Sequence, residues 1–443
     1  MDMLRDKTGP MYVRCLLPGL ITGISLSVFT MVDMYFVGQY VGADGMAAFS
    51  VVTPLLGVVS FLGVFVGVGG AVTMGVARGQ GDEDRSNALF TCSLLLLALL
   101  TALIWGFFLL FTEEIYRFFG ANQRLLPYVA DYADWYILSF PFFFFAIYAA
   151  FILRCDGAPG LASLAVIVGG LFNVAGDWYL VAVRDMGMAG AAIATVLGNL
   201  IQSLIFLAYF FSRRCTLRLK KPRRLSRGLY QVAGAGFSAG FIDIAYILLT
   251  ILLNNLVLHY GNEVDLAVFG VAYNCSTMFM RVFNGVGKGV QPIISTNYGA
   301  GQPGRILEIL RLSLWTELVL SLLLTSLGLL FPVGIVLFFV EYSPAVAAAS
   351  PGIMRPFFLT NLFLSFGMFS TYYFQSIVRS GLATLIALLR GILVSGLFSV
   401  LLPLVLGLSG IWWGMVLGEG LVAAFAMLMI LRSRPWLNTY VRE

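Results

Sequence analysis

Residues 79–85 read GQGDEDR and residues 299–305 read GAGQPGR, so two glycines and an arginine recur after a shift of 220 residues. The same shift carries Gly187 to Gly407 and Gly198 to Gly418, with no net insertion between them. A constant offset kept by glycines near segment ends indicates two copies of one module. The chain is therefore predicted to be an internal repeat, an organisation that is common in membrane transporters.

The composition places both copies in a membrane. Hydrophobic residues make up 60% of the 443 residues, and charged residues make up only 11%. Runs such as 94–110 and 318–340 are almost entirely apolar, and a run of about 20 such residues can cross a bilayer core of about 30 Å. A soluble helical protein would need polar faces at helical spacing on its outer helices. We therefore predict an all-α integral membrane protein.

The apolar runs define twelve predicted spans, six in each copy. Because six is even, both copies enter the membrane from the same side, and the repeat is parallel, with a pseudo-twofold axis along the membrane normal. We expect an N-lobe at 1–211 and a C-lobe at 229–443, joined by a basic linker at 212–228. The predicted spans are 11–38, 50–77, 87–111, 128–153, 160–183, 187–211, 229–257, 264–295, 305–338, 351–376, 382–405 and 409–431.

Basic residues predict the orientation. Nearly all loop arginines and lysines, Arg154 among them, fall on the side of the termini and the linker, whereas the other side carries only Arg117, Arg124, Arg184 and Arg355. The positive-inside rule therefore predicts a multi-pass plasma (inner) membrane protein with cytoplasmic N- and C-termini. The net charge of +5 reports this topology, and we expect membrane lipid but no nucleic acid as a partner.

Several signals of enzymatic chemistry are missing from the sequence. The five cysteines show no C-x-x-C spacing, and the single histidine, His259, lies in a predicted loop, so no disulfide, zinc site or catalytic triad is indicated. Glycine-rich stretches at 63–70 and 285–289 lie in apolar helices, where close helix packing explains them better than nucleotide binding. We predict a protein that is not an enzyme, has no cofactor and draws energy for transport from an ion gradient.

Charged residues inside the spans need an explanation. Each costs at least about 2.5 kcal/mol at the centre of a lone membrane helix, so each must face the protein interior, a cavity or a partner. For a single charge, a structural ion pair explains the position as well as a transport role does. These residues are Asp33, Asp177, Asp243, Arg281, Lys288, Glu317, Arg390 and Glu419, with Asp134 near a span end.

Two of these acids are predicted to lie at the same depth. Asp177 precedes the turn near residue 186 by nine residues and Thr195 follows it by nine, which puts both about 13 Å from the turn. Asp33 precedes Gly42, where the first span leaves the membrane on the same side, by nine residues, and Asn173 lies one helical turn from Asp177. These oxygen ligands suit a small cation, and two acids held together out of water titrate as a coupled pair. The alternative is a helix pair tied by hydrogen bonds.

Two further stretches of the chain are distinctive. Residues 32–38 read VDMYFVG and are followed by Gly42 and by alanines at 47–48, and residues 291–300 read QPIISTNYGA. The first resembles the first-span signature of the multidrug and toxic compound extrusion family, and the second resembles the end of that family's eighth span. The resemblance covers nearly the whole chain, including the twelve spans, the two lobes and the linker.

The resemblance implies an antiporter that exports lipophilic, often cationic, compounds in exchange for H⁺ or Na⁺. In prokaryotic members with a first-lobe cation site, the ligands correspond to Asp33, Asn173, Asp177 and Thr195, and a bend in the first span corresponds to Pro18. Another branch uses acids in spans seven and ten; Asp243 lies in span seven here, but span ten has no acid. The resemblance also implies rocking between inward-open and outward-open states.

Two other functions are alternatives to an antiporter. A lipid-linked precursor flippase of a related superfamily has similar lobes but usually more spans, and a membrane-embedded enzyme would need clustered catalytic groups. The sequence leaves H⁺ and Na⁺ coupling, the substrate and the conformational state open, and we expect a monomer. Candidate second-lobe or structural charges are Asp243, Arg281, Lys288 and Glu419.

The departures from the repeat are informative. Shifted by 220, each proposed cation ligand falls on an apolar residue: Leu253, Leu393, Leu397 and Met415. The second-lobe charges correspond in turn to Gly23, Phe61, Val68 and Asn199. The two copies are therefore expected to share an arrangement of helices but not the same functional residues.

Overall fold

A computed structural model describes residues 2–119, 121, 123–339 and 342–433, apart from the side chains of 43, 50, 54–55, 58–59 and 240–247. All regular structure in this part of the chain is helical. The first half contains α1 (Thr8–Phe36), η1 (Val37–Val41), α2 (Ala43–Gly79), α3 (Glu83–Leu110), α4 (Thr112–Phe118), α5 (Leu126–Leu138), α6 (Phe140–Cys155), α7 (Pro159–Gly176), η2 (Asp177–Val183) and α8 (Gly187–Phe210). The segments η1 and η2 are π-helical.

The second half repeats this plan. It contains α9 (Leu225–Tyr260), α10 (Glu263–Gly299), α11 (Pro303–Leu330), α12 (Pro332–Phe339), α13 (Pro344–Ser376), α14 (Ser380–Leu388), the π-helical η3 (Leu389–Leu393), α15 (Val394–Leu401), α16 (Pro403–Leu406) and α17 (Leu408–Arg432). Within the described residues, ten helices are long and apolar enough to cross a membrane, and the bent pair α5 and α6 forms an eleventh candidate. The remaining predicted span coincides with α9, a helix of 36 residues.

The helices differ from the predicted spans at three places. The predicted fourth span is not straight, because α5 and α6 meet at an angle of 59° and Pro141, which has no amide hydrogen, stands in the first turn of α6. The predicted ninth span runs too far, since α11 ends at Leu330 and Pro332 begins the separate helix α12. Helix α9 begins at Leu225, inside the predicted linker.

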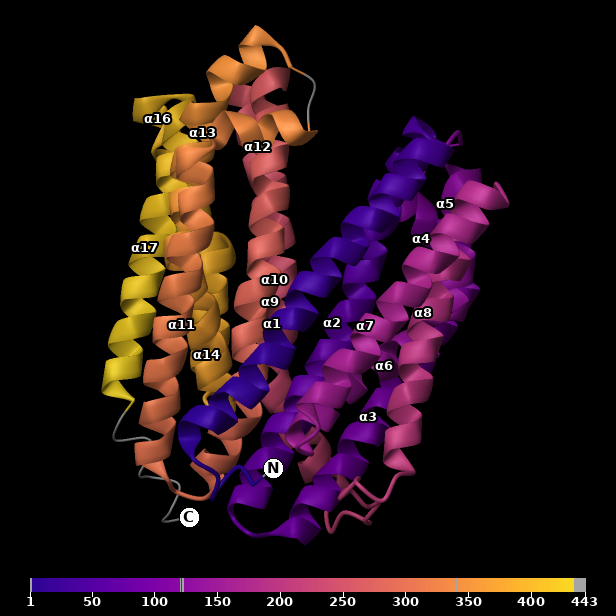
Figure 1. Ribbon diagram of the computed structural model, residues 1–443, viewed down its shortest axis with the longest axis vertical. Helices are drawn as coiled ribbons and strands as arrows, with labels where there is room; N and C mark the ends of the chain where they lie inside the picture. Colours follow the sequence, from indigo (N-terminus) through magenta and orange to yellow (C-terminus); the bar gives the residue numbers. More distant parts are fainter. Residues whose placement is uncertain (1, 120, 122, 340–341, 434–443) are drawn as a thin grey trace.

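The helices form two bundles that lie side by side (Figure 1). In the first, α2 packs on α6 and α7 packs on α8; in the second, α10 packs on α13 and α13 packs on α17. The beginning of α1 and the end of α17 lie at one end of the molecule, which we call the terminal end. The bundles approach each other at the terminal end and diverge toward the opposite, far end (Figure 1). The predicted all-α, two-lobe fold is confirmed.

Glycine makes the contact between the lobes close. A β-carbon added to Gly285 of α10 would lie 2.6 Å from the carbonyl oxygen of Gly19 in α1, and one added to Gly289 would lie 2.8 Å from the carbonyl oxygen of Cys15. On the other side of the seam, Gly236 of α9 meets the backbone of Phe65 in α2. These contacts all lie in the halves of the helices nearer the terminal end. The seam is therefore tightly closed there, as expected for small residues in membrane helices.

The linker is anchored to the first lobe through Asp156. Its fully buried carboxylate accepts hydrogen bonds from Arg78 Nη2 at 2.6 Å, from the Tyr209 hydroxyl at 2.7 Å and from the backbone nitrogen of Thr216 at 3.1 Å. The Thr216 hydroxyl also donates to it. The linker thus lies against the terminal end of its own lobe.

Asp156→Ala is expected to destabilise the protein by about 3–5 kcal/mol, because it leaves the Arg78 guanidinium without its buried partner. The midpoint of thermal unfolding of detergent-purified protein measures this loss. Asp84→Ala is the control, since the Asp84 side chain is 76% exposed and pairs only with Lys220 at the surface. Equal midpoints for the two variants would contradict the role assigned to Asp156.

Candidate cation site in the first lobe

Asp33 and Asp177 are brought together inside the first lobe. Asp33 lies in the last turns of α1 and is 8% exposed, whereas Asp177 is the first residue of η2 and is fully buried. Helix α1 contacts η2, and the two carboxyl groups lie close enough to influence each other electrostatically. The equal depth predicted from the span ends is therefore found in the structure.

The two carboxyl groups have unmet hydrogen-bonding capacity. Among the described residues, no donor reaches Oδ1 of Asp33 or either carboxyl oxygen of Asp177. Carboxylates only accept hydrogen bonds, so two charged ones cannot satisfy each other, and burying both charges is costly. One proton held between them would turn one group into a donor to the other.

Asn173 and Thr195 complete the cluster from α7 and α8. The amide nitrogen Nδ2 of Asn173 donates to Thr195 Oγ1 over 3.3 Å. Gly176 packs against Ala194 and Gly169 against Gly198, and these contacts hold α7 and α8 in register at the site. All four residues of the predicted ligand set thus lie in one region of the first lobe.

Tyr132 is a neighbour of the cluster that was not predicted from the sequence. It comes from α5, is 1% exposed, and its hydroxyl lies near Thr195, Asp33 and Asp177. Its ring packs edge-on against Phe49 of α2, with ring centroids 5.7 Å apart. No sequence signal could have found it, because α5 joins the site only through the bend that separates it from α6.

Two of the three π-helical segments border this site. Segment η1 follows Asp33 by a few residues, and η2 begins at Asp177 itself. An extra residue per turn rotates the side chains that follow, and such segments are often found at functional sites. In α1 the helix is continuous across Pro18, whose carbonyl accepts bonds from the hydroxyls of Thr22 at 2.8 Å and Ser163 at 2.6 Å. The bend at Pro18 stays a prediction.

Two of the predicted second-lobe charges bridge the lobes. Arg281 Nη1 of α10 donates to the carbonyl of Leu26 at 3.0 Å and to Thr30 Oγ1 at 3.1 Å, both in α1. The ammonium group of Lys288, two turns further along α10, lies 5.6 Å from the ring centroid of Phe151 in α6. These side chains are thus accommodated at the interface between the lobes, as expected for charges within membrane spans.

Arg154 is placed differently from the prediction. Its predicted place is a loop, but it is 5% exposed and belongs to α6. Its Nη2 reaches Thr22 Oγ1 of α1 at 3.5 Å, and no acceptor among the described residues reaches Nε. The prediction was wrong because α6 continues past the expected end of the fourth span.

Glu419, in contrast, lies inside the second lobe and is 2% exposed. It accepts a hydrogen bond from Ser395 Oγ at 3.2 Å. The side chain of Asp243 lies outside the described residues.

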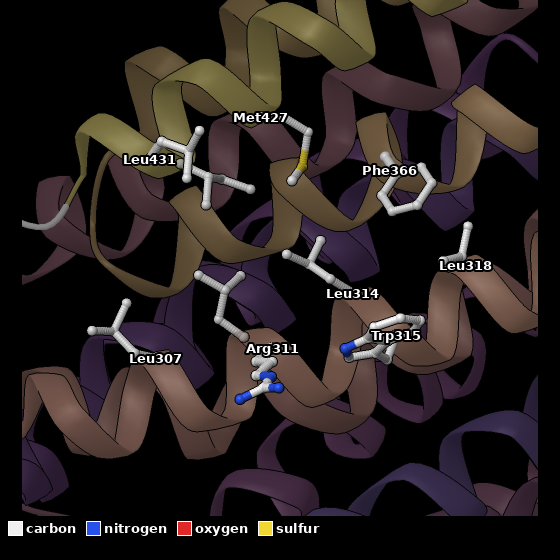
Figure 2. A pocket seen from close by; sticks show the side chains of 10 residues that line it. Leu307, Arg311, Leu314, Trp315, Leu318, Phe366, Met427 and Leu431 are labelled. Carbon is white, nitrogen blue, oxygen red and sulfur yellow. The ribbon is translucent and has the colours of Figure 1, made fainter.

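Two hollows in the described part of the chain lie apart from this acid pair. Within the described residues, no three His, Cys, Asp or Glu side chains gather as a metal site would require. A hollow of about 480 Å³ lies on the second lobe between α11, α13 and α17 (Figure 2), and its lining is apolar apart from Arg311 and the indole nitrogen of Trp315. Another, of about 520 Å³, is lined by Arg78 and Asp156 at the terminal end. Neither of these hollows is lined by Asp33 or Asp177.

Comparisons with known proteins agree with this architecture. The Multidrug export protein MepA of Staphylococcus saprophyticus is 25% identical over 425 residues, which cover 94% of this chain and 92% of that protein. A crystal structure of MATE in complex with MaD3S has a TM-score of 0.92 at 20% identity and covers 98% of both chains. An outward-facing structure of a multidrug resistance MATE family transporter of the MOP superfamily has a TM-score of 0.91 at 21% identity, with the same coverage.

The model of the MatE family matches residues 18–179 and 239–405, which is one segment in each lobe and together well over half of the chain. The matched segments include Asp33, Asn173 and Asp177. Two lobes of repeated membrane helices, a buried acid pair in the first lobe and this match lead to one conclusion: the chain belongs to the MatE family of multi-pass membrane transporters, which are not enzymes.

Proposed function

We propose that this protein is a secondary active antiporter that exports lipophilic, often cationic, small molecules in exchange for protons, and that Asp33 and Asp177 bind the coupling proton. The observation that carries the proposal is the buried pair of carboxyl groups whose oxygens lack donors. A proton satisfies both groups at once and removes a buried charge. Export of small molecules is supported by the relatives named multidrug export protein.

The arrangement of Asn173 and Thr195 favours a proton over sodium. A sodium ion needs several oxygen ligands turned toward one point. Thr195 Oγ1 instead accepts a hydrogen bond from the Asn173 amide nitrogen, so this oxygen is already engaged with a donor. The acid pair is then the main group of the cluster whose oxygens can still accept a proton.

The closed seam between the lobes suggests how the protein is oriented in the membrane and how its transport cycle proceeds. With cytoplasmic termini, as the basic loops predict, the closed terminal end faces the cytoplasm and the diverging far end faces outward. Protonation of the acid pair changes the charge beside α1, and a bend at Pro18 would carry this change to the seam. Coupling requires only that the proton and the substrate bind the two states with different affinities. We propose a monomer in the plasma (inner) membrane, surrounded by lipid.

Purified protein in proteoliposomes tests the coupling ion. Ethidium is placed inside, and its efflux is followed while either a proton gradient or a sodium gradient is imposed alone. We expect the proton gradient to drive efflux and the sodium gradient to leave it at the rate of protein-free vesicles. Efflux driven only by sodium would overturn the assignment of the proton.

A further inference from the structure

The second lobe buries an acid and a base that the proposed function does not use. Glu419 in α17 is 2% exposed, and Arg390 in η3 is 3% exposed. Among the described residues, nothing bonds to Oε2 of Glu419 or to Nη1 of Arg390. No ion pair within 4 Å joins the two groups in this part of the chain. Both side chains thus keep open bonding capacity in the interior of the lobe.

The two side chains approach the same glycine. A β-carbon added to Gly367 of α13 would lie 3.2 Å from Cδ of Arg390 and 3.9 Å from Oε2 of Glu419. Ser395 of α15 donates to the other carboxyl oxygen, Oε1, at 3.2 Å. One oxygen of Glu419 is therefore held by a neutral hydroxyl, while the other points to the region where the missing side chain of Gly367 leaves room.

Arg390 is the one described charge that faces Glu419. The elements packed against α17 are α13, α15, α16, η3 and α9. Helices α15 and α16 carry no titratable residue, and the charge of α13 is the exposed Arg355 near its start. The hydroxyls of Tyr372 and Tyr373 in α13 bond elsewhere, to Asn284 and Ser433.

The remaining packed element, α9, contributes few titratable groups near this depth. Its described titratable residues stand near its two ends. Asp243, in its middle, has a side chain outside the described residues. The described partners of Glu419 are thus Arg390 and Ser395.

The repeat gives this pair a counterpart in the first lobe. Shifted by 220, Arg390 falls on Gly170 and Glu419 on Asn199, in α7 and α8. Helix α7 supplies Asn173 and leads directly into Asp177 of η2, and α8 supplies Thr195. Gly170 is three residues from Asn173, and Asn199 is four from Thr195, so the two sites use equivalent helix pairs about one turn apart. Both copies thus place polar side chains on this helix pair, and the acid of the second copy stands where the first copy has Asn199.

We infer that Glu419 is a second proton-binding carboxyl group, with Arg390 as its counter-charge, so that the second lobe carries a proton site of its own. The inference rests on the proposed proton coupling. A hydronium ion transfers its proton to Oε2: its own O–H bond breaks, a new O–H bond forms on the carboxyl group, and a water molecule is left. Charged Glu419 is attracted to Arg390, whereas neutral Glu419 leaves Arg390 without a counter-charge. Protonation therefore changes how η3 and α17 interact, which is the kind of change that shifts a two-state equilibrium.

The number of protons exchanged per substrate tests the inference. Full-length protein is reconstituted in proteoliposomes, valinomycin and equal potassium clamp the voltage at zero, and the ethidium ratio at equilibrium is measured at several pH differences. The slope of the logarithm of this ratio against the pH difference equals the proton number. We expect the slope to fall by about one in Glu419→Gln while transport persists, because one linked proton is lost.

The control is Glu308→Gln, the same chemical change at an exposed residue of α11, which should keep the wild-type slope. Glu419→Asp retains the carboxyl group and should keep it too. A wild-type slope in Glu419→Gln would overturn the second-lobe site and leave the first-lobe site standing. A slope of zero in wild type would overturn both, and the two failures are therefore distinguishable.

A second measurement covers the case in which Glu419→Gln does not fold. Protons released when ethidium is added are measured with a pH indicator on the purified double variant Asp33→Asn with Asp177→Asn. Release that persists supports a proton site outside the first lobe. Absence of any release, when ethidium still binds, would overturn the inference.

Discussion

Asp33→Asn and Asp177→Asn are each expected to abolish export driven by a proton gradient. An amide has the size of the acid but binds no proton in this pH range, so the site can no longer distinguish high from low proton concentration. We therefore expect the export rate under a proton gradient to fall to that of protein-free vesicles. Ethidium efflux from proteoliposomes under an imposed pH gradient measures it.

The control for this experiment is Asp131→Asn, at an exposed position of α5 near the same site. We expect this variant to export at the wild-type rate. Each variant should elute as folded protein in size-exclusion chromatography, because replacing a buried carboxyl group with an amide of the same shape adds no charge to the interior. Normal efflux by both Asp33→Asn and Asp177→Asn would remove the first-lobe site from the proposed function.

Gly19→Ala is expected to open the seam at the terminal end. The added β-carbon would overlap the carbonyl oxygen of Gly285, and this oxygen belongs to the backbone of α10 and cannot move aside. Overpacking of this kind costs about 1–3 kcal/mol, which lowers the ratio of closed to open seam by a factor of about 5 to 150. Export should fall because the closed state is part of the cycle.

Spin labels at Gln80 and Gln302, near the terminal ends of the two lobes, report the seam directly. We expect the distribution of label distances to shift to longer values in Gly19→Ala. Gly9→Ala is the matched control, since a β-carbon at Gly9 in the same helix meets nothing within 4 Å. An unchanged distance distribution in Gly19→Ala would show that the contact with Gly285 does not hold the lobes together.

Much of the candidate site could be predicted because span ends are easy to locate in so apolar a chain. The turn near residue 186 is where η2 ends and α8 begins, so counting residues from it placed Asp177 and Thr195 at one depth. Counting could not predict Tyr132, since its approach depends on the 59° bend between α5 and α6. Nor could it show that Arg154 is buried, because hydropathy does not tell where α6 ends.

The proximity of Arg390 and Glu419 in the second lobe likewise could not be predicted from the sequence. Arg390 and Glu419 are both recognisable in the sequence as charges within spans, yet nothing in their spacing joins them. They meet because η3 lies next to α17 and because Gly367 leaves room between them. Which face of each helix turns inward depends on packing against its neighbours, and the π-helical turn in η3 changes that face locally.

The sequence by itself determined the membrane class, the parallel repeat, the two lobes and the absence of the first-lobe ligands from the second copy. Hydropathy and periodicity are local properties, and a repeat is visible by direct comparison, so these features need no coordinates. Only the tertiary structure decided which acids face each other, which charges bridge the lobes and at which end the seam is closed. Those features depend on helix rotation, bending and close packing between residues that are far apart in the chain, and such distances cannot be obtained from spacing along a single helix.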